Sequence, residues 1–236
     1  MNDHMIFVVA EIGVNWDGDF ELAKEMMTVA KKVGCNAVKF QAYDEKLMST
    51  HPERSSLMKS TISKTNIETI NSLSKSIGIE WFCTPMYLES VDLLDPYVQR
   101  FKIRELDSRS LLENKTTPLF ERILKTNKEI IISSQKSPYR TKYFNHPKVR
   151  WLYCVPKYPC DLNDIDFTNF KYFHGFSNHS PMLIAPLTAA ILGGKIIEVH
   201  ITKSKSKNFI DNNVSLDYSE LEELVNLIRL SEKMKK

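Results

Sequence analysis

The sequence lacks an apolar segment long enough to cross a membrane, and it lacks a strong excess of charge of either sign. Its first apolar run, Met5–Ala10, is much shorter than the roughly 20 residues of a membrane helix and too short for the core of a signal peptide. The 32 lysines and arginines nearly balance the 29 aspartates and glutamates, leaving a formal net charge of +3. We therefore predict a cytoplasmic protein whose main partner is neither nucleic acid nor an anionic membrane.

Cysteine is scarce as well, and the usual nucleotide-binding motifs are missing. The chain has 4 cysteines, Cys35, Cys83, Cys154 and Cys160, and the last two lack C-x-x-C spacing. Because no secretion signal accompanies them, we expect reduced thiols. No G-x-G-x-x-G or G-x-x-x-x-G-K sequence follows an apolar run, so a nucleotide-binding fold has no positive support. No low-complexity linker divides the chain, which indicates one domain over residues 1–236.

What the sequence does contain is a series of short apolar runs rich in Val, Ile and Phe, alternating with segments of helical periodicity. This alternation is typical of β/α units. The predicted strands are Ile6–Ile12, Ala37–Gln41, Glu80–Thr84, Arg100–Ile103, Glu129–Ser133, Arg150–Cys154, Tyr172–Phe176 and Lys195–Ile201. The predicted helices are Glu21–Val33, Asn66–Ile77, Leu88–Leu94, Leu112–Lys125, Ile184–Leu192 and Ser219–Met234. Eight such strands in a chain of this length predict a single-domain (β/α)8 TIM barrel rather than an open doubly wound sheet.

Polar residues end most of the predicted strands. In a (β/α)8 barrel the active site is built at the carboxyl ends of the strands, so these residues are the informative ones. They are Glu11, Lys39, Gln41, Thr84, Lys102, Ser133, Tyr158, Ser177, His179 and His200. Each one alone could mark only the return of the chain to solvent. Together they predict a shared site at one mouth of the barrel.

Lys39 and Lys102 lie inside runs that otherwise read as buried, AVKFQ and RFKIR. A buried ammonium group needs an anionic partner. Two of them facing one pocket would repel each other unless an anion such as phosphate or carboxylate lay between them. This arrangement predicts an anionic substrate.

His179 and His200 end the seventh and eighth predicted strands, which are neighbours in a closed barrel. Two imidazoles suit a divalent transition metal whose remaining positions are filled by water or substrate. A lone histidine, however, is more often a structural or surface residue, and that alternative stays open for each. The remaining histidines, His4, His51, His146 and His174, are interpreted as surface or structural.

Nine motifs of the chain, in order and spacing, resemble the sialic acid synthase (N-acetylneuraminate synthase) family. They are AEIGVNWDGDFELAKEM, GCNAVKFQAY, GIEWFCTPM, FKI with a nearby acidic residue, EIIISS, LYCVPKYP, GFSNHS, APLTAAILGGKIIEVHIT and FIDNNVSLDYSELEELV. The resemblance implies a (β/α)8 catalytic domain that condenses phosphoenolpyruvate with N-acetylmannosamine or a related 2-acetamido sugar. The products would be a nonulosonic (sialic-type) acid and phosphate, as in sialic acid biosynthesis.

The resemblance also implies a divalent metal, Mn²⁺ or Mg²⁺, with His179 and His200 as its protein ligands. Five further residues would hold the phosphate or carboxylate of phosphoenolpyruvate. They are Lys39, Lys102, Ser133, Tyr158 and Ser177.

For the part of the site that binds the sugar, the resemblance implies four more residues. Glu11 would contact the sugar and act in proton transfer, with Gln41 close to it. Asp107 stands where the family has an acidic residue after its fourth strand, and it is assigned a catalytic role with Glu11. Asp211 corresponds to an acidic sugar contact after the eighth strand.

Seven positions near the implied site depart from the residues that the family usually has. They are Trp16 (for His), Arg104 and Glu105 (for small residues and Ser), Gln135 (for Gly), Pro156 and Lys157 (for small hydroxyl or amide residues) and Asn178 (for Asp). The typical synthase also continues into a small antifreeze-like domain whose arginine reaches the partner subunit's active site. The 236 residues contain no such domain. Arg104 could then supply that charge, or a separate antifreeze-like protein could supply the absent domain. A homodimer is possible, and the oligomeric state stays open.

Three interpretations stay open at this point. The first is an active short synthase that uses an unusual sugar. The second is another metal-dependent lyase or aldolase on the same barrel, since a fold does not fix its chemistry. The third is a non-catalytic, partner-dependent barrel that no longer binds phosphoenolpyruvate.

Overall fold

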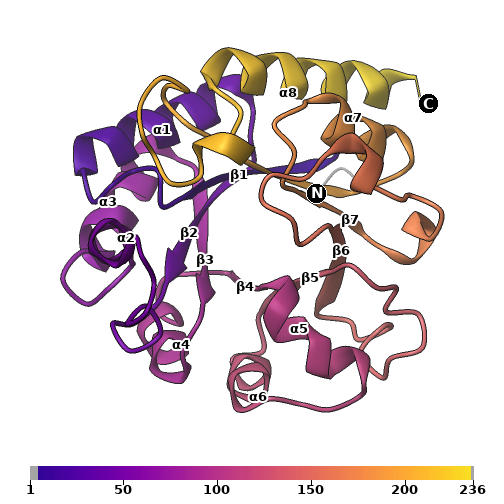
Figure 1. The fold of residues 1–236 in the computed structure, drawn as a ribbon, viewed down its shortest axis with the longest axis horizontal. Helices are drawn as coiled ribbons and strands as arrows, with labels where there is room; N and C mark the ends of the chain where they lie inside the picture. The colour runs from indigo at the N-terminus through magenta and orange to yellow at the C-terminus, as the bar shows by residue number, and fades with distance from the viewer. Residues whose placement is uncertain (1–4, 235–236) are drawn as a thin grey trace.

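Each apolar run that was predicted as a strand contributes one strand to a closed parallel barrel (Figure 1). This computed structural model describes residues 5–234. The strands are β1 (Phe7–Gly13), β2 (Ala37–Ala42), β3 (Glu80–Pro85), β4 (Arg100–Ile103), β5 (Glu129–Ser134), β6 (Val149–Cys154), β7 (Gly175–Asn178) and β8 (Ile196–His200). They pair in chain order, and β1 pairs with β8 to close the barrel. The predicted (β/α)8 TIM barrel is therefore confirmed.

Helices cover the outside of the barrel (Figure 1). The α-helices are α1 (Phe20–Val33), α2 (Arg54–Ser60), α3 (Ile67–Ile77), α4 (Leu88–Leu94), α5 (Glu105–Leu112), α6 (Pro118–Lys125), α7 (Ile184–Ile191) and α8 (Tyr218–Lys233). Three short 3-10 helices are η1 (Leu162–Asp164), η2 (Phe170–Tyr172) and η3 (Asn212–Val214). Local signals fix their ends. The Asp19 carboxylate accepts from two backbone N–H groups at the start of α1, and Gly34 ends that helix in the left-handed conformation with φ 97°.

The strands read as continuous apolar runs because both of their faces are buried. Their outer faces pack under the helices, and their inner faces fill the barrel. Val8, Phe40, Phe82, Ile131 and Trp151 are all fully buried in one continuous core. The register brings Glu11 of β1 beside Lys39 of β2 on one side and beside His200 of β8 on the other. Polar side chains thus meet at the carboxyl end of the barrel.

Two predicted elements were wrong in their bounds, and two helices, α2 and α5, were missed. The predicted helix Leu112–Lys125 is shortened to α6, because Thr117 caps the helix and Pro118 occupies its first position. Leu112 is instead the last residue of α5, which was not predicted. The seventh strand begins at Gly175 rather than at Tyr172, since residues 170–172 form η2. No periodic apolar pattern marks α2, which is only 7 residues long.

Residues 1–4 and 235–236 of the predicted domain, and His4 with them, lie outside the described residues. Across residues 5–234, no helix is long and apolar enough to span a bilayer. All four cysteines are buried as free thiols, as their spacing predicts.

Gly175 is required by a close approach between β7 and β8. A Cβ atom added there would lie 1.8 Å from the carbonyl oxygen of Ile196. We expect Gly175→Ala to lower the free energy of unfolding by about 3 kcal/mol or more, because the backbone of one strand must move. Urea denaturation of the variant measures this. Gly78→Ala is the matched control, because its φ of 73° is strained but nothing lies within 4 Å, and it should cost about 1 kcal/mol. Equal losses in the two variants would contradict the prediction.

Candidate active site

A cavity of about 570 Å³ opens at the carboxyl ends of the barrel strands. Ten of the eleven residues predicted for the site line this cavity. They are Glu11, Lys39, Gln41, Lys102, Ser133, Tyr158, Ser177, His179, His200 and Asp211. The exception is Asp107, which is not among the lining residues; both of its carboxylate oxygens accept from Arg104, at 2.6 and 3.1 Å. The strand ends therefore converge as the barrel geometry predicts.

The two buried lysines are neutralised by carboxylates of the chain itself. Lys39 Nζ lies 2.8 Å from Glu11 Oε1, and Lys102 Nζ lies 2.6 Å from Glu198 Oε1. Glu198 also lies 3.8 Å from Lys39 Nζ, so its carboxylate stands between the two ammonium groups. The prediction that a substrate anion must separate the lysines was wrong, because Glu198 already occupies that place. An anionic substrate is then not required by the two lysines alone.

Glu198 is the main site residue that the sequence analysis missed. Its side chain is buried, lines the cavity and accepts from the Ser177 hydroxyl at 2.8 Å. It lies two residues before His200 on β8, so both side chains point to the same face of the strand. The available signal was a charged residue within an apolar strand, which is the signal that identified Lys39.

Burial and pairing shift the pKa values of these groups. Burial would raise the pKa of Glu198, but Lys102 and Lys39 outweigh it and lower the pKa to about 2. For Lys39, burial is opposed by Glu11 and Glu198, and the net pKa is raised. For Lys102, burial is the largest effect and the pKa is lowered. Glu198 is therefore a carboxylate at neutral pH, held between two ammonium donors.

His179 and His200 face each other across the mouth, with ring centroids 5.6 Å apart. His179 Nδ1 lies 2.9 Å from the Val155 carbonyl oxygen. If Nδ1 donates to that carbonyl, Nε2 keeps a free lone pair. Metal-binding histidines are commonly oriented by a hydrogen bond of this kind from their other ring nitrogen. Burial, followed by the effect of His200, lowers the pKa of His179 to about 3. Its imidazole is therefore neutral, as metal ligation requires.

His200 is held between Tyr158 and Asp211. The Tyr158 hydroxyl lies 2.6 Å from His200 Nε2, and the Tyr158 ring lies 4.3 Å from the ring of His179. Asp211 Oδ2 lies 3.2 Å from His200 Nδ1 but is not aligned for a hydrogen bond. In the described part of the chain, no three His, Cys, Asp or Glu side chains converge on one point. A metal at this mouth would therefore have at most two imidazole ligands, with further ligands from water or substrate.

Several buried polar atoms at the cavity have no hydrogen-bond partner among the described residues. They are Glu11 Oε2, Ser133 Oγ, Glu198 Oε2 and His200 Nδ1. Buried polar atoms are normally hydrogen-bonded, so their clustering in one cavity points to a polar ligand. Glu11 shows this most clearly. Its Oε1 accepts from Gln41 at 2.9 Å and pairs with Lys39, while its Oε2 remains available.

The unusual charges after β4 pair with one another at the rim. Arg104 is held by Asp107, and Arg109 donates to both carboxylate oxygens of Glu105 at 2.8 to 3.1 Å. Arg104, Glu105 and Arg109 line the cavity. Glu105 therefore does not present an uncompensated charge to an anionic ligand. Thr84, Cys154 and His51 also line the cavity, and His51 is exposed, which agrees with its interpretation as a surface residue.

Most of the other departures have local structural explanations. Trp16 is fully buried, and its indole N–H donates to the Ser60 carbonyl at 3.0 Å. Asn178 folds back onto Ser180, with its Nδ2 2.6 Å from the Ser180 carbonyl oxygen. Lys157 forms an ion pair with Asp164 outside the cavity. Of the remaining two, Pro156 lines the cavity and Gln135 is exposed after β5.

The conserved-sequence pattern of the NeuB family matches residues 26–236. The chain belongs to the NeuB family. The resemblance to the sialic acid synthase family is thus confirmed.

Similar proteins and solved structures agree with membership of the NeuB family. The uncharacterized protein MJ1065 of Methanocaldococcus jannaschii is 33% identical over 97% of this chain and 71% of its own length. The N,N'-diacetyllegionaminic acid synthase of Legionella pneumophila is 27% identical over 96% of this chain and 72% of its own length. The crystal structure of an N-acetylneuraminic acid synthetase from Leptospira borgpetersenii, in complex with citrate, aligns with a TM-score of 0.85 at 25% identity. It covers 98% of this chain and 85% of the synthetase.

Proposed function

We propose that the protein condenses phosphoenolpyruvate with the open-chain aldehyde form of N-acetylmannosamine or a related 2-acetamido sugar, giving a nonulosonic acid and phosphate. The observation that carries the proposal is that one cavity contains two ion-paired buried lysines, two facing imidazoles and Glu11. One carboxylate oxygen of Glu11, Oε2, has no hydrogen-bond partner. The NeuB-family synthases among the relatives support the same class of reaction.

The proposed reaction forms one carbon–carbon bond and breaks one carbon–oxygen bond. The third carbon of phosphoenolpyruvate bonds to the aldehyde carbon, and the aldehyde oxygen takes up a proton. Water adds to the second carbon of phosphoenolpyruvate, and phosphate leaves with the bridging oxygen. The protein must therefore bind a trianion, orient an aldehyde and move protons.

Lys39 and Lys102 would hold the phosphate or carboxylate of phosphoenolpyruvate. An ammonium group has three donors, and Lys102 uses two of them, on Glu198 at 2.6 Å and on Ser177 at 3.4 Å. The third is available to a substrate oxygen. Ser133 offers an unpartnered buried hydroxyl to the same ligand, and Ser177 and Tyr158 would complete its contacts.

Glu11 would exchange the proton at the aldehyde oxygen through Oε2. Its other oxygen is fixed by Gln41 and Lys39, so the free oxygen has a defined direction. Asp211 would contact a hydroxyl group of the sugar from beside His200. Asp107 would act as a positioning residue, because it reaches the cavity only through Arg104. Mn²⁺ or Mg²⁺ held by His179 and His200 would polarise the aldehyde carbonyl when bound.

The Tyr158 hydroxyl supplies a separable test of substrate binding. Tyr158→Phe keeps the ring over His179 and removes the hydroxyl from His200. A single hydrogen bond contributes about 1 kcal/mol, so we expect kcat/KM for phosphoenolpyruvate to fall about 5-fold. Urea denaturation should show a change in stability of about 1 kcal/mol or less. Unchanged kcat/KM would exclude a substrate contact for this hydroxyl.

Phosphate release tests the proposed function as a whole. The protein should release phosphate from phosphoenolpyruvate, with Mn²⁺ present, only when a suitable 2-acetamido sugar is added. Phosphoenolpyruvate alone should raise the melting temperature, since a ligand at 100 times its Kd adds about 2.7 kcal/mol to stability. Failure with every sugar together with no thermal shift would overturn the proposal. Turnover of a different carbonyl compound would instead favour another metal-dependent lyase or aldolase.

A further inference from the structure

The barrel lacks its outer α-helix after β5 and again after β6. Residues 135–148 and 155–174 connect these strands to the next ones, and their only helical turns are η1 and η2. The two segments lie as loops beside β6, whereas α-helices follow the other six strands (Figure 1). The first segment folds as successive turns, with the Thr141 N–H donating to the Pro138 carbonyl at 2.8 Å. The outer surface here is therefore built by turns and side-chain contacts instead of a helix.

Three aromatic rings from the two segments pack together on this side of the barrel. The ring centroid of Tyr139 lies 4.5 Å from that of Tyr172 and 5.5 Å from that of Phe144. Phe144 and Tyr172 are 6.4 Å apart. Tyr139 nevertheless remains 54% exposed. A tyrosine that is held in place and still exposed suits an interface anchor, because it offers a large contact area at a low cost in side-chain entropy.

Exposed cations surround the aromatic rings. Lys171 Nζ lies 5.2 Å from the ring centroid of Tyr172, and Lys142 Nζ lies 4.9 Å from that of Tyr143. Arg140 lies in the same turn as Tyr139. Within residues 5–234, none of these three cations forms an ion pair. We call the surface of Tyr139, Arg140, Lys142, Lys171 and Tyr172 the basic-aromatic face.

The chain supplies few carboxylates to neutralise this face. Between Glu129 and Asp161 it has six lysines or arginines and no acidic residue. Two of the six are paired, Arg150 with Glu129 and Lys157 with Asp164. The other four form no ion pair in the described part of the chain; they are Lys136, Arg140, Lys142 and Lys148. The positive charge is therefore available to a partner.

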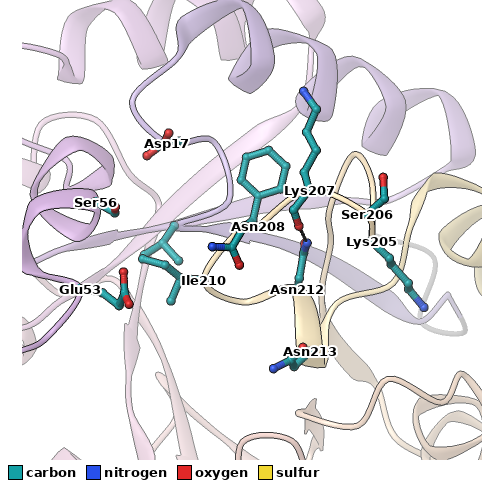
Figure 2. Close-up of a pocket in the computed structure, with 12 residues that line it drawn as sticks. Asp17, Glu53, Ser56, Lys205, Ser206, Lys207, Asn208, Ile210, Asn212 and Asn213 are labelled. Carbon is teal, nitrogen blue, oxygen red and sulfur yellow. Dashed lines mark hydrogen bonds between the residues drawn. The ribbon is translucent and has the colours of Figure 1, made fainter.

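The cavity of about 450 Å³ beside the barrel mouth has the opposite character (Figure 2). Asp17 and Glu53 line it, and neither forms an ion pair among the residues that the structure describes. Figure 2 shows the Lys207 side chain extending away from Glu53. A carboxylate-rich partner would be repelled from that cavity. The two regions therefore suit partners of different charge.

We propose that the basic-aromatic face docks an acidic segment of another protein. Carboxylates of the segment pair with Arg140, Lys142 and Lys171, and an apolar side chain packs on Tyr139. None of the five residues of the face lines either cavity, and small molecules are bound in concave sites. Nucleic acid is disfavoured because the whole chain carries a net charge of only +3. The inference is independent of the proposed function, since the face lies outside the active-site cavity.

Fluorescence anisotropy tests the inference with the full chain and a labelled peptide of sequence DDEWDDEWDD. We expect saturable binding that weakens about 10-fold when NaCl is raised from about 0.05 M to about 0.5 M, because salt screens exposed ion pairs. The triple variant Arg140→Gln, Lys142→Gln and Lys171→Gln should raise the Kd about 10-fold or more. Tyr139→Ala should raise the Kd about 10-fold at both salt concentrations, since an apolar contact is not screened.

The matched control is Lys46→Gln, Lys64→Gln and Lys207→Gln. It removes three exposed cations that form no ion pair among the described residues and lie outside the face. Its net charge equals that of the first triple variant, yet its Kd should equal that of the wild-type chain. Neither triple variant should change phosphate release, because none of the six residues lines the active-site cavity.

Three results would overturn the inference. They are no binding of the peptide to the wild-type chain, equal losses in the two triple variants, and tighter binding of an oligothymidylate of the same charge. The last result would assign the face to single-stranded nucleic acid, which also combines phosphates with stacking bases. Absence of phosphate release from every form of the protein would count against the proposed function alone, because the peptide measurement needs no turnover.

Discussion

Replacing Lys102 by Met is expected to lower kcat/KM for phosphoenolpyruvate by about 1,000-fold, which corresponds to about 4 kcal/mol. The substitution removes the ammonium group that lies 2.6 Å from Glu198 and has one donor free for substrate. It also leaves the Glu198 carboxylate facing an incoming trianion, with Lys39 3.8 Å away as its remaining ionic partner. Steady-state phosphate release measures the effect.

The same variant is expected to lose stability, and a second substitution separates the two effects. Breaking one partner of a buried ion pair costs about 3–5 kcal/mol. Adding Glu198→Gln to Lys102→Met removes the uncompensated charge and leaves Lys39 paired with Glu11. Urea denaturation should show most of the stability restored, while kcat/KM stays low. Recovery of activity in the double variant would contradict a direct role of Lys102 in binding substrate.

Replacing His200 by Ala is expected to abolish stoichiometric Mn²⁺ uptake, and His179→Ala should do the same. The reason is the small number of protein donors. A metal at this mouth would have two imidazole ligands, so losing one leaves a single protein ligand. Condensation should fall about 1,000-fold or more, since the metal would supply the polarisation of the aldehyde.

Equilibrium dialysis with Mn²⁺ measures this uptake directly. His146→Ala is the matched control, because His146 lies in the loop before β6 and outside the cavity. Its ring accepts a hydrogen bond from the Lys148 backbone N–H. Its uptake should equal that of the wild-type chain. Unchanged uptake in His179→Ala and His200→Ala would refute the assignment of both residues.

The barrel could be predicted from the sequence because its signals are local. A strand that is buried on both faces must be largely apolar. The runs EIIISS and AVKFQ follow this requirement. Helix ends are less certain where one segment follows another closely. Pro118 and Thr117 mark a helix start inside what reads as a single periodic segment, and their capping contact is visible only in the structure.

The sequence predicts most of the residues that line the candidate site, but not which of them form ion pairs with one another. Lys39 and Lys102 are conspicuous as charges in apolar runs, yet the sequence does not say which carboxylate each one meets. Glu198 lies far from both in the chain and reaches them only because β8 closes the barrel against β1.

The central claim is that this cavity joins phosphoenolpyruvate to a sugar aldehyde, and the mass of the product tests it most directly. Phosphoenolpyruvate labelled with ¹⁸O at the bridging oxygen should be incubated with Mn²⁺ and the acceptor sugar, with Lys102→Met as the matched control. The account predicts a product whose mass equals sugar plus phosphoenolpyruvate plus water minus phosphoric acid, with the ¹⁸O label in the released phosphate and no product from the variant. Labelled pyruvate with unlabelled phosphate, and no nine-carbon acid, would contradict it.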